Sequence, residues 1–375
     1  MLTPMVFAVA VLIAPAAAAP LQVEVSSDDA GERLLVDGRA TFVRGVNWDY
    51  IPVGENYAYN LWEQPDAFIE DVLRQEMGLL AAAGINSIRL YPGIPPRWVE
   101  HIYDTYGITT MLNPLVGRYG LSIDGRWVPV VDYSDERTRQ LLKEQTLAEV
   151  APYHDTRGVL LYLLGNESNY GLVWDSFEIA DLPPEEQNSA RARYLYSLFG
   201  EITREIQGQN PHQPVALCNG DLQYLDLIKQ EMPTLQIFGT NVYRGRSARD
   251  LYQRVRDELG LPVLYTEFGA DAFNARTGRE DHLLQASYLK DQWQEVYEQS
   301  WGKGLAGNVI GGYTFQWSDG WWKYGQDKNL SVQDTTASWA NGGYPEDLVP
   351  GGNNMNEEWF GIAAKGRSEE RRVGK

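Results

Sequence analysis

Eight short apolar segments recur along residues 43–315 of this 375-residue chain, and stretches with helical periodicity separate them. Their aliphatic and β-branched residues are typical of strands that are buried on both faces. The expected strands cover 43–48, 85–91, 108–113, 159–164, 215–218, 235–239, 262–265 and 308–315. Strands that alternate with helices form a parallel sheet, and eight such units close into a (β/α)8 TIM barrel of the α/β class. A doubly wound sheet is the alternative, but it needs no eighth strand and usually has a glycine-rich first turn.

Helices are expected between these strands, at 65–83, 96–106, 135–153, 184–209, 222–232, 247–259 and 279–302. Ser134 is the expected N-cap of the helix over 135–153. Asp37-Gly38 predicts a short N-terminal β-hairpin, and Asp124-Gly125 predicts a second hairpin within 121–131. The glycine-rich and tryptophan-rich sequence after the eighth strand predicts a long loop over the barrel mouth.

Both ends of the chain depart from the barrel pattern. The first 20 residues hold an apolar segment that ends in an alanine-rich stretch, which predicts a signal peptide over 1–19 with cleavage near Ala19. A single N-terminal membrane anchor is the alternative reading. We expect one barrel domain over 20–365, periplasmic or secreted, with no membrane span in the mature chain. Residues 366–375 form an atypical tail, which we expect to be truncated or foreign sequence.

The net charge and the numbers of cysteines and histidines exclude some classes of protein function. The formal net charge is −19, which argues against a nucleic-acid partner bound through a basic face. Cys218 is the only cysteine, so no internal disulfide is possible, and export without disulfides suits a bacterial periplasm or secretion. The four histidines show no zinc-site spacing, so neither a metal nor another cofactor is predicted. The oligomeric state is not predicted.

The fourth apolar segment ends abruptly at Gly165-Asn166-Glu167. A barrel strand that ends in Asn-Glu places a carboxylate at the rim where barrel active sites lie. Glu267 follows the seventh segment in the same way, within Thr266-Glu267-Phe268-Gly269. Two carboxylates at this rim can flank one glycosidic bond, one as a proton donor and the other as a nucleophile. Capping of a helix N-terminus is the alternative for either glutamate alone.

The chain is also rich in aromatic residues, with 12 tryptophans and 22 tyrosines. Flat aromatic faces stack against sugar rings, although core packing is the ordinary role of such residues. Aromatic residues near strand ends or in loops are therefore candidates for substrate contacts.

The two glutamate motifs resemble the acid/base and nucleophile motifs of the clan A retaining glycoside hydrolases. With the segment 42–48, they are most similar to the barrel domain of glycoside hydrolase family 2. The resemblance covers about residues 33–365, and the β-sandwich domains usual in that family have no counterpart in this sequence. A barrel without them also resembles family 5 and the fungal-type β-1,3-glucanosyltransferases.

The resemblance implies a role for each matching position. Glu167 would be the acid/base and Glu267 the nucleophile. Asn166 would contact the sugar 2-hydroxyl, Tyr243 would donate a hydrogen bond to the nucleophile, and Trp317 would form the floor under the sugar. Arg89, near the end of the second strand, would hydrogen-bond the nucleophile and hold it ionised. A rim salt bridge for Arg89 and core packing for Tyr243 and Trp317 are the alternatives. The weaker candidates for sugar contacts, for each of which a plain loop or packing role is the alternative, are Trp48, Asp49, Asn219, Asp221, Asp271, Trp321 and Trp322.

The predicted function is therefore a retaining β-glycoside hydrolase that acts on an oligo- or polysaccharide. A β-glucan transglycosylase with the same site is one alternative, and a non-catalytic carbohydrate-binding barrel is another. An aldolase or a metal-dependent hydrolase would need a lysine or a histidine cluster at the strand ends, and the sequence shows neither. The sequence specifies neither the sugar nor endo or exo action, although the lack of a basic cluster argues against uronic acids.

Overall fold

The computed structural model describes residues 19–323, 325, 329–365 and 372–373. The expected leader over 1–19 lies outside these residues except for Ala19. The expected tail over 366–375 lies outside them except for Arg372 and Val373, which form β17 (Arg372–Val373) and pair with β16 (Ala363–Ala364). The assignments of both chain ends therefore stay predictions.

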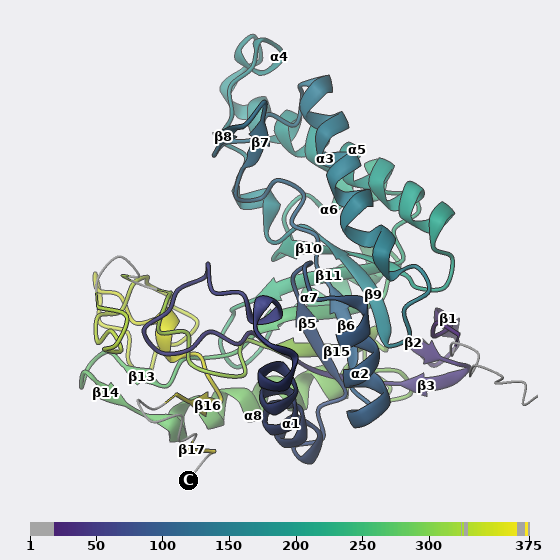
Figure 1. The fold of residues 1–375 in the computed structure, drawn as a ribbon. Coiled ribbons are helices and arrows are strands. Elements are labelled where there is room, and N and C mark those ends of the chain that lie inside the picture. The colour runs from purple at the N-terminus through teal and green to yellow at the C-terminus, as the bar shows by residue number, and fades with distance from the viewer. Residues whose placement is uncertain (1–18, 324, 326–328, 366–371, 374–375) are drawn as a thin grey trace, which may run out of the picture.

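Eight parallel strands close into a barrel, so the predicted fold is confirmed and the doubly wound alternative is wrong (Figure 1). Each strand pairs with its sequence neighbours in the barrel, and the last strand pairs with the first. The strands are β4 (Val43–Asn47), β5 (Ser87–Leu90), β6 (Thr109–Leu112), β9 (Val159–Leu164), β10 (Val215–Gly220), β11 (Ile237–Val242), β12 (Val263–Phe268) and β15 (Val309–Thr314).

Helices connect successive barrel strands, as the sequence predicted. They are α1 (Asp66–Ala82), α2 (Pro96–Tyr106), α3 (Glu136–Val150), α4 (Phe177–Ala180), α5 (Pro184–Gln209), α6 (Leu225–Glu231), α7 (Leu251–Glu258) and α8 (His282–Glu298). The prediction of Ser134 as the N-cap of α3 is wrong by one residue. The side chain of Asp135 accepts the hydrogen bond from the Thr138 amide, while the Ser134 hydroxyl donates to Asp132.

The N-terminal hairpin is confirmed and extended by a third strand. β1 (Val23–Asp28), β2 (Gly31–Val36) and β3 (Arg39–Thr41) form an antiparallel sheet, and the predicted turn at Asp37-Gly38 joins β2 to β3. Leu21 and Leu34 pack into one buried cluster with barrel residues such as Leu161. The sheet therefore contributes side chains to the core inside the barrel.

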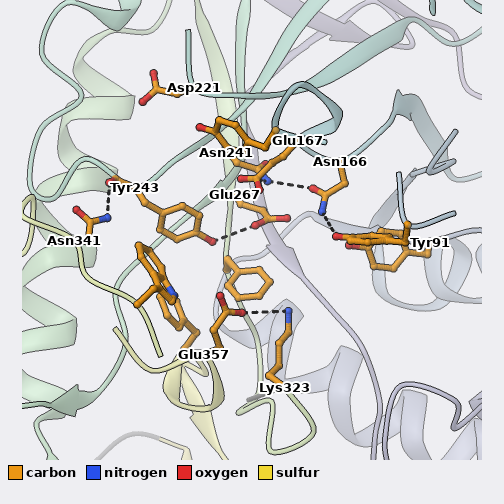
Figure 2. A pocket seen from close by; sticks show the side chains of 15 residues that line it. Tyr91, Asn166, Glu167, Asp221, Asn241, Tyr243, Glu267, Lys323, Asn341 and Glu357 are labelled. Carbon is orange, nitrogen blue, oxygen red and sulfur yellow. Dashed lines mark hydrogen bonds and ion pairs between the residues drawn. The ribbon is translucent and has the colours of Figure 1, made fainter. Parts of the chain in front are cut away.

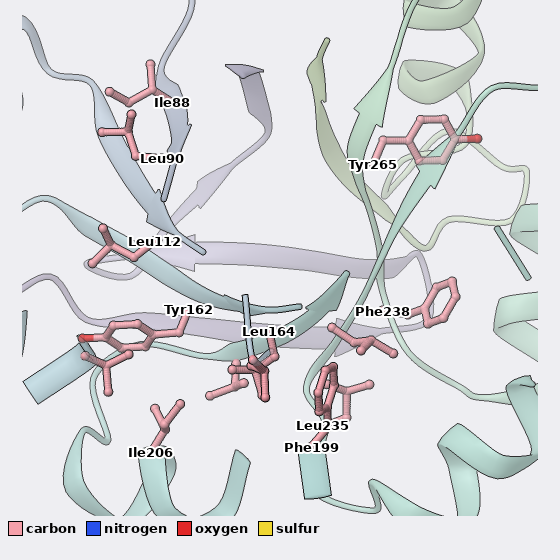
Figure 3. Close-up of a cluster of buried hydrophobic side chains, with 14 of the residues drawn as sticks. Ile88, Leu90, Leu112, Tyr162, Leu164, Phe199, Ile206, Leu235, Phe238 and Tyr265 are labelled. Carbon is pink, nitrogen blue, oxygen red and sulfur yellow. The ribbon is translucent and has the colours of Figure 1, made fainter. Parts of the chain in front are cut away.

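Each barrel strand separates two cores because successive side chains point to opposite faces. In β9, Leu161 and Leu163 belong to the cluster inside the barrel. Tyr162 and Leu164 belong instead to the larger cluster between strands and helices, with Phe199 of α5 (Figure 3). Burial on both faces explains why the strand sequences are almost continuously apolar.

Long connections follow several of the barrel strands. β7 (Leu121–Ile123) and β8 (Arg126–Val128) form the predicted second hairpin after β6. β13 (Phe273–Asn274) and β14 (Arg279–Glu280) follow β12. After β15, the described part of 315–362 contains no α-helix, only the short 3-10 helix η4 (Glu357–Trp359). The prediction of a long loop after the eighth strand is therefore confirmed for the described residues.

Close approach of β15 to β4 gives a test of the barrel packing. Gly311 has φ +128°, and a Cβ atom there would lie 2.1 Å from the carbonyl oxygen of Val43. Gly311→Ala should therefore lower the free energy of unfolding by about 2–4 kcal/mol, since it adds both backbone strain and a clash. Gly208 in α5 has open space around it. Gly208→Ala should be neutral or stabilising by less than about 1 kcal/mol. Urea unfolding measures both, and equal effects would contradict the expected clash.

Candidate functional site

The turn after β9 aims Glu167 into a cavity at the barrel mouth (Figure 2). Gly165 has φ +74°, and a Cβ atom there would lie within 3 Å of Ser168 and Phe199, so only glycine fits without rearrangement. Glu167 itself adopts a left-handed conformation with φ +52°, and its amide donates to the carbonyl of Cys218 at 3.0 Å. This hydrogen bond ties the glutamate to the neighbouring strand β10, and the unusual backbone conformation is typical of functional sites.

A β-bulge near the end of β12 positions Glu267. Thr240 of β11 pairs with Tyr265, but the next residue, Asn241, pairs with Glu267, so Thr266 is the extra residue. The Thr266 hydroxyl donates to Asn241 Oδ1 at 2.7 Å. The bulge therefore lets both Thr266 and Glu267 make polar contacts at the barrel mouth, whereas regular alternation would send one of them outward.

Arg89 of β5 forms a buried ion pair with Glu267. Its Nη1 lies 2.6 Å from Glu267 Oε1, and the guanidinium is almost fully buried. Asn113 accepts from Nε at 2.9 Å and from Nη2 at 2.6 Å, while Asn166 accepts from Nη2 at 2.9 Å. Asn47 Oδ1 accepts from Nη1 at 3.2 Å. The guanidinium is thus held in a single orientation by side chains from several strand ends.

Two hydrogen-bond donors from β11 and its carboxyl end complete the contacts of the glutamates. Tyr243 donates its hydroxyl proton to Glu267 Oε2 at 3.1 Å. Asn241 Nδ2 lies 3.1 Å from both Glu167 Oε1 and Asn166 Oδ1. Asn241 and Tyr243 are two positions apart, so their side chains point to the same side of the chain and reach the same cavity. Burial raises the pKa of Tyr243 well above its ordinary value, and Glu267 adds to the effect, so Tyr243 stays a donor.

The environments of the two glutamates differ strongly. Burial first, and then the negative charge of Glu267, raise the pKa of Glu167 to about 7, against the hydrogen bond from Asn241. Glu267, by contrast, has Arg89 as a direct cationic partner. Glu167 is therefore suited to carry a proton near neutral pH, while Glu267 is held by a buried cation.

The cavity between these residues has a volume of about 450 Å³. Aromatic rings and polar side chains share its wall, which is typical of a site for a polar organic ligand. Its lining residues are Tyr91, Tyr119, Asn166, Glu167, Tyr170, Asp221, Asn241, Tyr243, Glu267, Phe315, Lys323, Trp339, Asn341, Glu357 and Phe360.

The structure brings together five of the sequence-predicted site residues: Glu167, Glu267, Arg89, Asn166 and Tyr243. Asp221, a weaker candidate, also lines the cavity. The other candidates do not line it, and their substrate contacts stay predictions.

Trp48 and Trp317, two of those other candidates, are buried away from the cavity. Both indole N–H groups donate to Glu76, with a Trp48 distance of 3.4 Å. Asn219 is also buried, and its amide donates to the carbonyl of Asp221 at 2.9 Å. These contacts support core and loop structure rather than an open sugar subsite. Phe315, two residues before Trp317, lines the cavity instead.

Several residues of the site were missed by the sequence analysis. Asn113, which contacts Arg89, is the last residue of an expected strand, and Asn241 lies two positions before Tyr243. Strand-end polarity and alternation could therefore have identified both. Lys323, Trp339, Asn341, Glu357 and Phe360 come from the long segment after β15. No periodic pattern marks them, because that segment is irregular.

Neither a metal site nor a membrane helix emerges from the described residues. Among them, no group of three histidine, cysteine, aspartate or glutamate side chains lies in an arrangement that could hold a metal ion. Likewise, no helix within the described ranges is long and apolar enough to cross a membrane.

Comparison with solved structures identifies proteins of similar fold. The β-D-glucuronidase of Dictyoglomus thermophilum matches with a TM-score of 0.56 at 14% identity, over 94% of this chain and 52% of that one. The GH2 β-galacturonidase of Eisenbergiella tayi, bound to galacturonate, gives 0.54 at 16% identity, over 91% and 51%. The Bacteroides uniformis β-glucuronidase gives 0.59 at 12% identity, over 91% and 35%.

The predicted resemblance to the barrel of glycoside hydrolase family 2 is thereby confirmed at the level of the fold. The chain spans about half the length, or less, of these three proteins. No family model matches the sequence, and no curated protein matches it.

The electrostatic coupling of the two glutamates is testable. Glu267→Gln should lower the pKa of Glu167 from about 7, because it removes the neighbouring negative charge. Carbon-13 NMR titration of the glutamate carboxyl groups measures this value. Glu205→Gln, an exposed change in α5, should leave it unchanged. An identical Glu167 titration in Glu267→Gln and in the unmodified protein would contradict the coupling.

Proposed function

We propose that this chain is a β-glycosidase that acts with retention of configuration, through Glu267 as nucleophile and Glu167 as acid/base. The observation that carries the proposal is the contrast between two glutamates at one cavity. One glutamate has a pKa raised to about 7, and the other is paired with a buried arginine. A retaining glycosidase needs this division between a proton donor and an ionised nucleophile. The fold shared with β-glucuronidases and a β-galacturonidase agrees with a glycosidase.

In the first step, a carboxylate oxygen of Glu267 attacks the anomeric carbon while the bond to the leaving oxygen breaks. Glu167 transfers its proton to that oxygen, and a covalent glycosyl-enzyme forms. Arg89 and Tyr243 hold the attacking carboxylate in place, since each contacts a different oxygen of Glu267. Asn166, whose side-chain oxygen accepts from Arg89 and Asn241, would contact the sugar 2-hydroxyl.

In the second step, Glu167 is ionised and takes a proton from the incoming acceptor. The acceptor oxygen bonds to the anomeric carbon, and Glu267 leaves as a carboxylate. Water as acceptor gives hydrolysis, whereas a sugar hydroxyl gives transglycosylation. Both outcomes use the same residues and differ only in the acceptor.

Exposed tyrosines favour an oligo- or polysaccharide over a free monosaccharide glycoside. Tyr91, Tyr119 and Tyr170 line the cavity, yet 48%, 54% and 48% of their surfaces remain exposed. Such faces can stack against further sugar rings of a chain. The N-terminal sequence adds export to the periplasm or the medium to this proposal.

A 2-fluoro aryl β-glycoside with a good leaving group should trap the covalent intermediate on Glu267. The fluorine slows both formation and breakdown of the intermediate, and the good leaving group restores the rate of formation only. Peptide mass spectrometry locates the label. Glu267→Gln should remain unlabelled, and Glu205→Gln should label like the unmodified protein. Labelling of any other residue would overturn the nucleophile assignment.

Azide then separates the two roles. With Glu167→Ala it should give a β-glycosyl azide, since azide replaces the acceptor that Glu167 would deprotonate. With Glu267→Ala it should give the α-azide, since azide enters where the nucleophile stood. Proton NMR of the products distinguishes the anomers, and the reverse pairing would exchange the two assignments.

The kcat/KM of an aryl β-glycoside with a poor leaving group should fall above pH about 7. Glu167 must be protonated in the first step, and its raised pKa keeps the proton on it only up to that range. The expected decline approaches tenfold per pH unit. A dinitrophenyl glycoside, whose leaving group needs no proton, should show a much weaker decline. A decline of equal steepness with both substrates would contradict this role of Glu167.

A further inference from the structure

Four carboxylates line the cavity, and two of the arginines around it, Arg89 and Arg244, are paired with carboxylates of this lining. Glu267 pairs with Arg89 at 2.6 Å. Asp221 accepts from Arg244 Nε at 2.8 Å. Of the described residues lining the cavity, Lys323 is the only cationic one, and its Nζ lies 3.9 Å from Glu357 Oε2. The described lining residues therefore leave no cation free for an anionic substrate group.

Lys323 and Glu357 come from opposite ends of the long segment after β15 and meet at the cavity wall (Figure 2). The Lys323 ammonium lies 4.5 Å from the centre of the Phe315 ring and 5.0 Å from that of Trp322. These aromatic contacts hold the ammonium at the wall. The side chains of Lys323 and Glu357 remain 21% and 38% exposed, so both can contact a ligand.

On the basis of the proposed function, we propose that the Lys323–Glu357 pair makes this site selective for a neutral pyranoside and against a uronide. The pair offers a carboxylate acceptor beside an ammonium donor, which matches neighbouring hydroxyl groups of a neutral sugar. A uronate carboxylate at the same wall would face Glu357, and its approach to Lys323 would require displacement of that partner. Like charges in a partly buried site disfavour binding strongly.

This assignment separates the chain from its neighbours of similar fold, which are β-glucuronidases and a β-galacturonidase. A shared barrel does not fix the substrate, because loops at the strand ends build the specificity. Here the selective pair lies in such a loop, outside the strand ends that hold Glu167 and Glu267.

Matched aryl β-glycosides that differ only at C6 test the proposal. The pairs are glucoside with glucuronide, galactoside with galacturonide, and mannoside with mannuronide, each with the same leaving group. The kcat/KM for at least one neutral substrate should exceed that for every uronide by about 100-fold or more, from the repulsion between like charges. A uronide turned over as well as the best neutral glycoside would overturn the inference, while the proposed glycosidase would stand.

Two variants test whether the Lys323–Glu357 pair causes the selectivity against uronides. Glu357→Gln removes the repelling charge and frees Lys323, so uronide kcat/KM should rise about tenfold while the neutral value falls. Lys323→Met should weaken turnover of neutral substrates and give no gain with uronides. Glu205→Gln, the same one-charge change in α5, should leave the selectivity ratio unchanged. An unchanged ratio in Glu357→Gln, with circular dichroism showing a folded protein, would overturn the role of the pair.

Absence of turnover and of 2-fluoro labelling for every member of both series is a different result. It would overturn the proposed function, and the inference with it. Uronide preference alone overturns only the inference, so the two failures are distinguishable.

Discussion

The buried guanidinium of Arg89 is the interaction on which the arrangement of the site depends. It connects its own strand β5 to side chains at the ends of β4, β6, β9 and β12. An arginine removed from water must have its donors satisfied, and removal of one partner of a buried ion pair costs about 3–5 kcal/mol. The same contacts that satisfy the guanidinium also orient Asn166 and Glu267. The same hydrogen bonds of Arg89 therefore stabilise the barrel mouth and set the geometry of the candidate site.

The barrel and the two glutamates could be predicted because local sequence patterns mark the strands, and a barrel brings the ends of its strands close together. Runs of buried aliphatic residues mark the strands, and parallel strands bring all their carboxyl ends to one rim. Glu167 and Glu267 are 100 residues apart in sequence, yet their motifs end strands of the same barrel. Polar residues at these ends, such as Arg89 and Tyr243, converge for the same reason. The fold and the two glutamates were thus readable from the sequence.

The remaining part depends on how irregular segments pack, which no periodicity encodes. Trp317 has the size and position expected of a cavity wall, but its indole donates to the buried Glu76 of α1. Phe315, the first residue after β15, lines the cavity instead. Lys323 and Glu357 meet only because a long segment folds back on itself. The bulge at Thr266 could not be predicted either, because the sequence around it has only the pattern of a regular strand.

The cavity wall is built from two parts of the chain, the barrel strand ends and the long segment after β15. The groups that would react come from strand ends locked into the barrel, whereas one contiguous stretch supplies Lys323, Trp339 and Glu357. That stretch has its own buried anchors, since Asp271 accepts from the Asn356 amide at 2.8 Å. Substitutions confined to that stretch can therefore change which ligand the cavity accepts, while the strand ends keep Arg89, Glu167 and Glu267 in place.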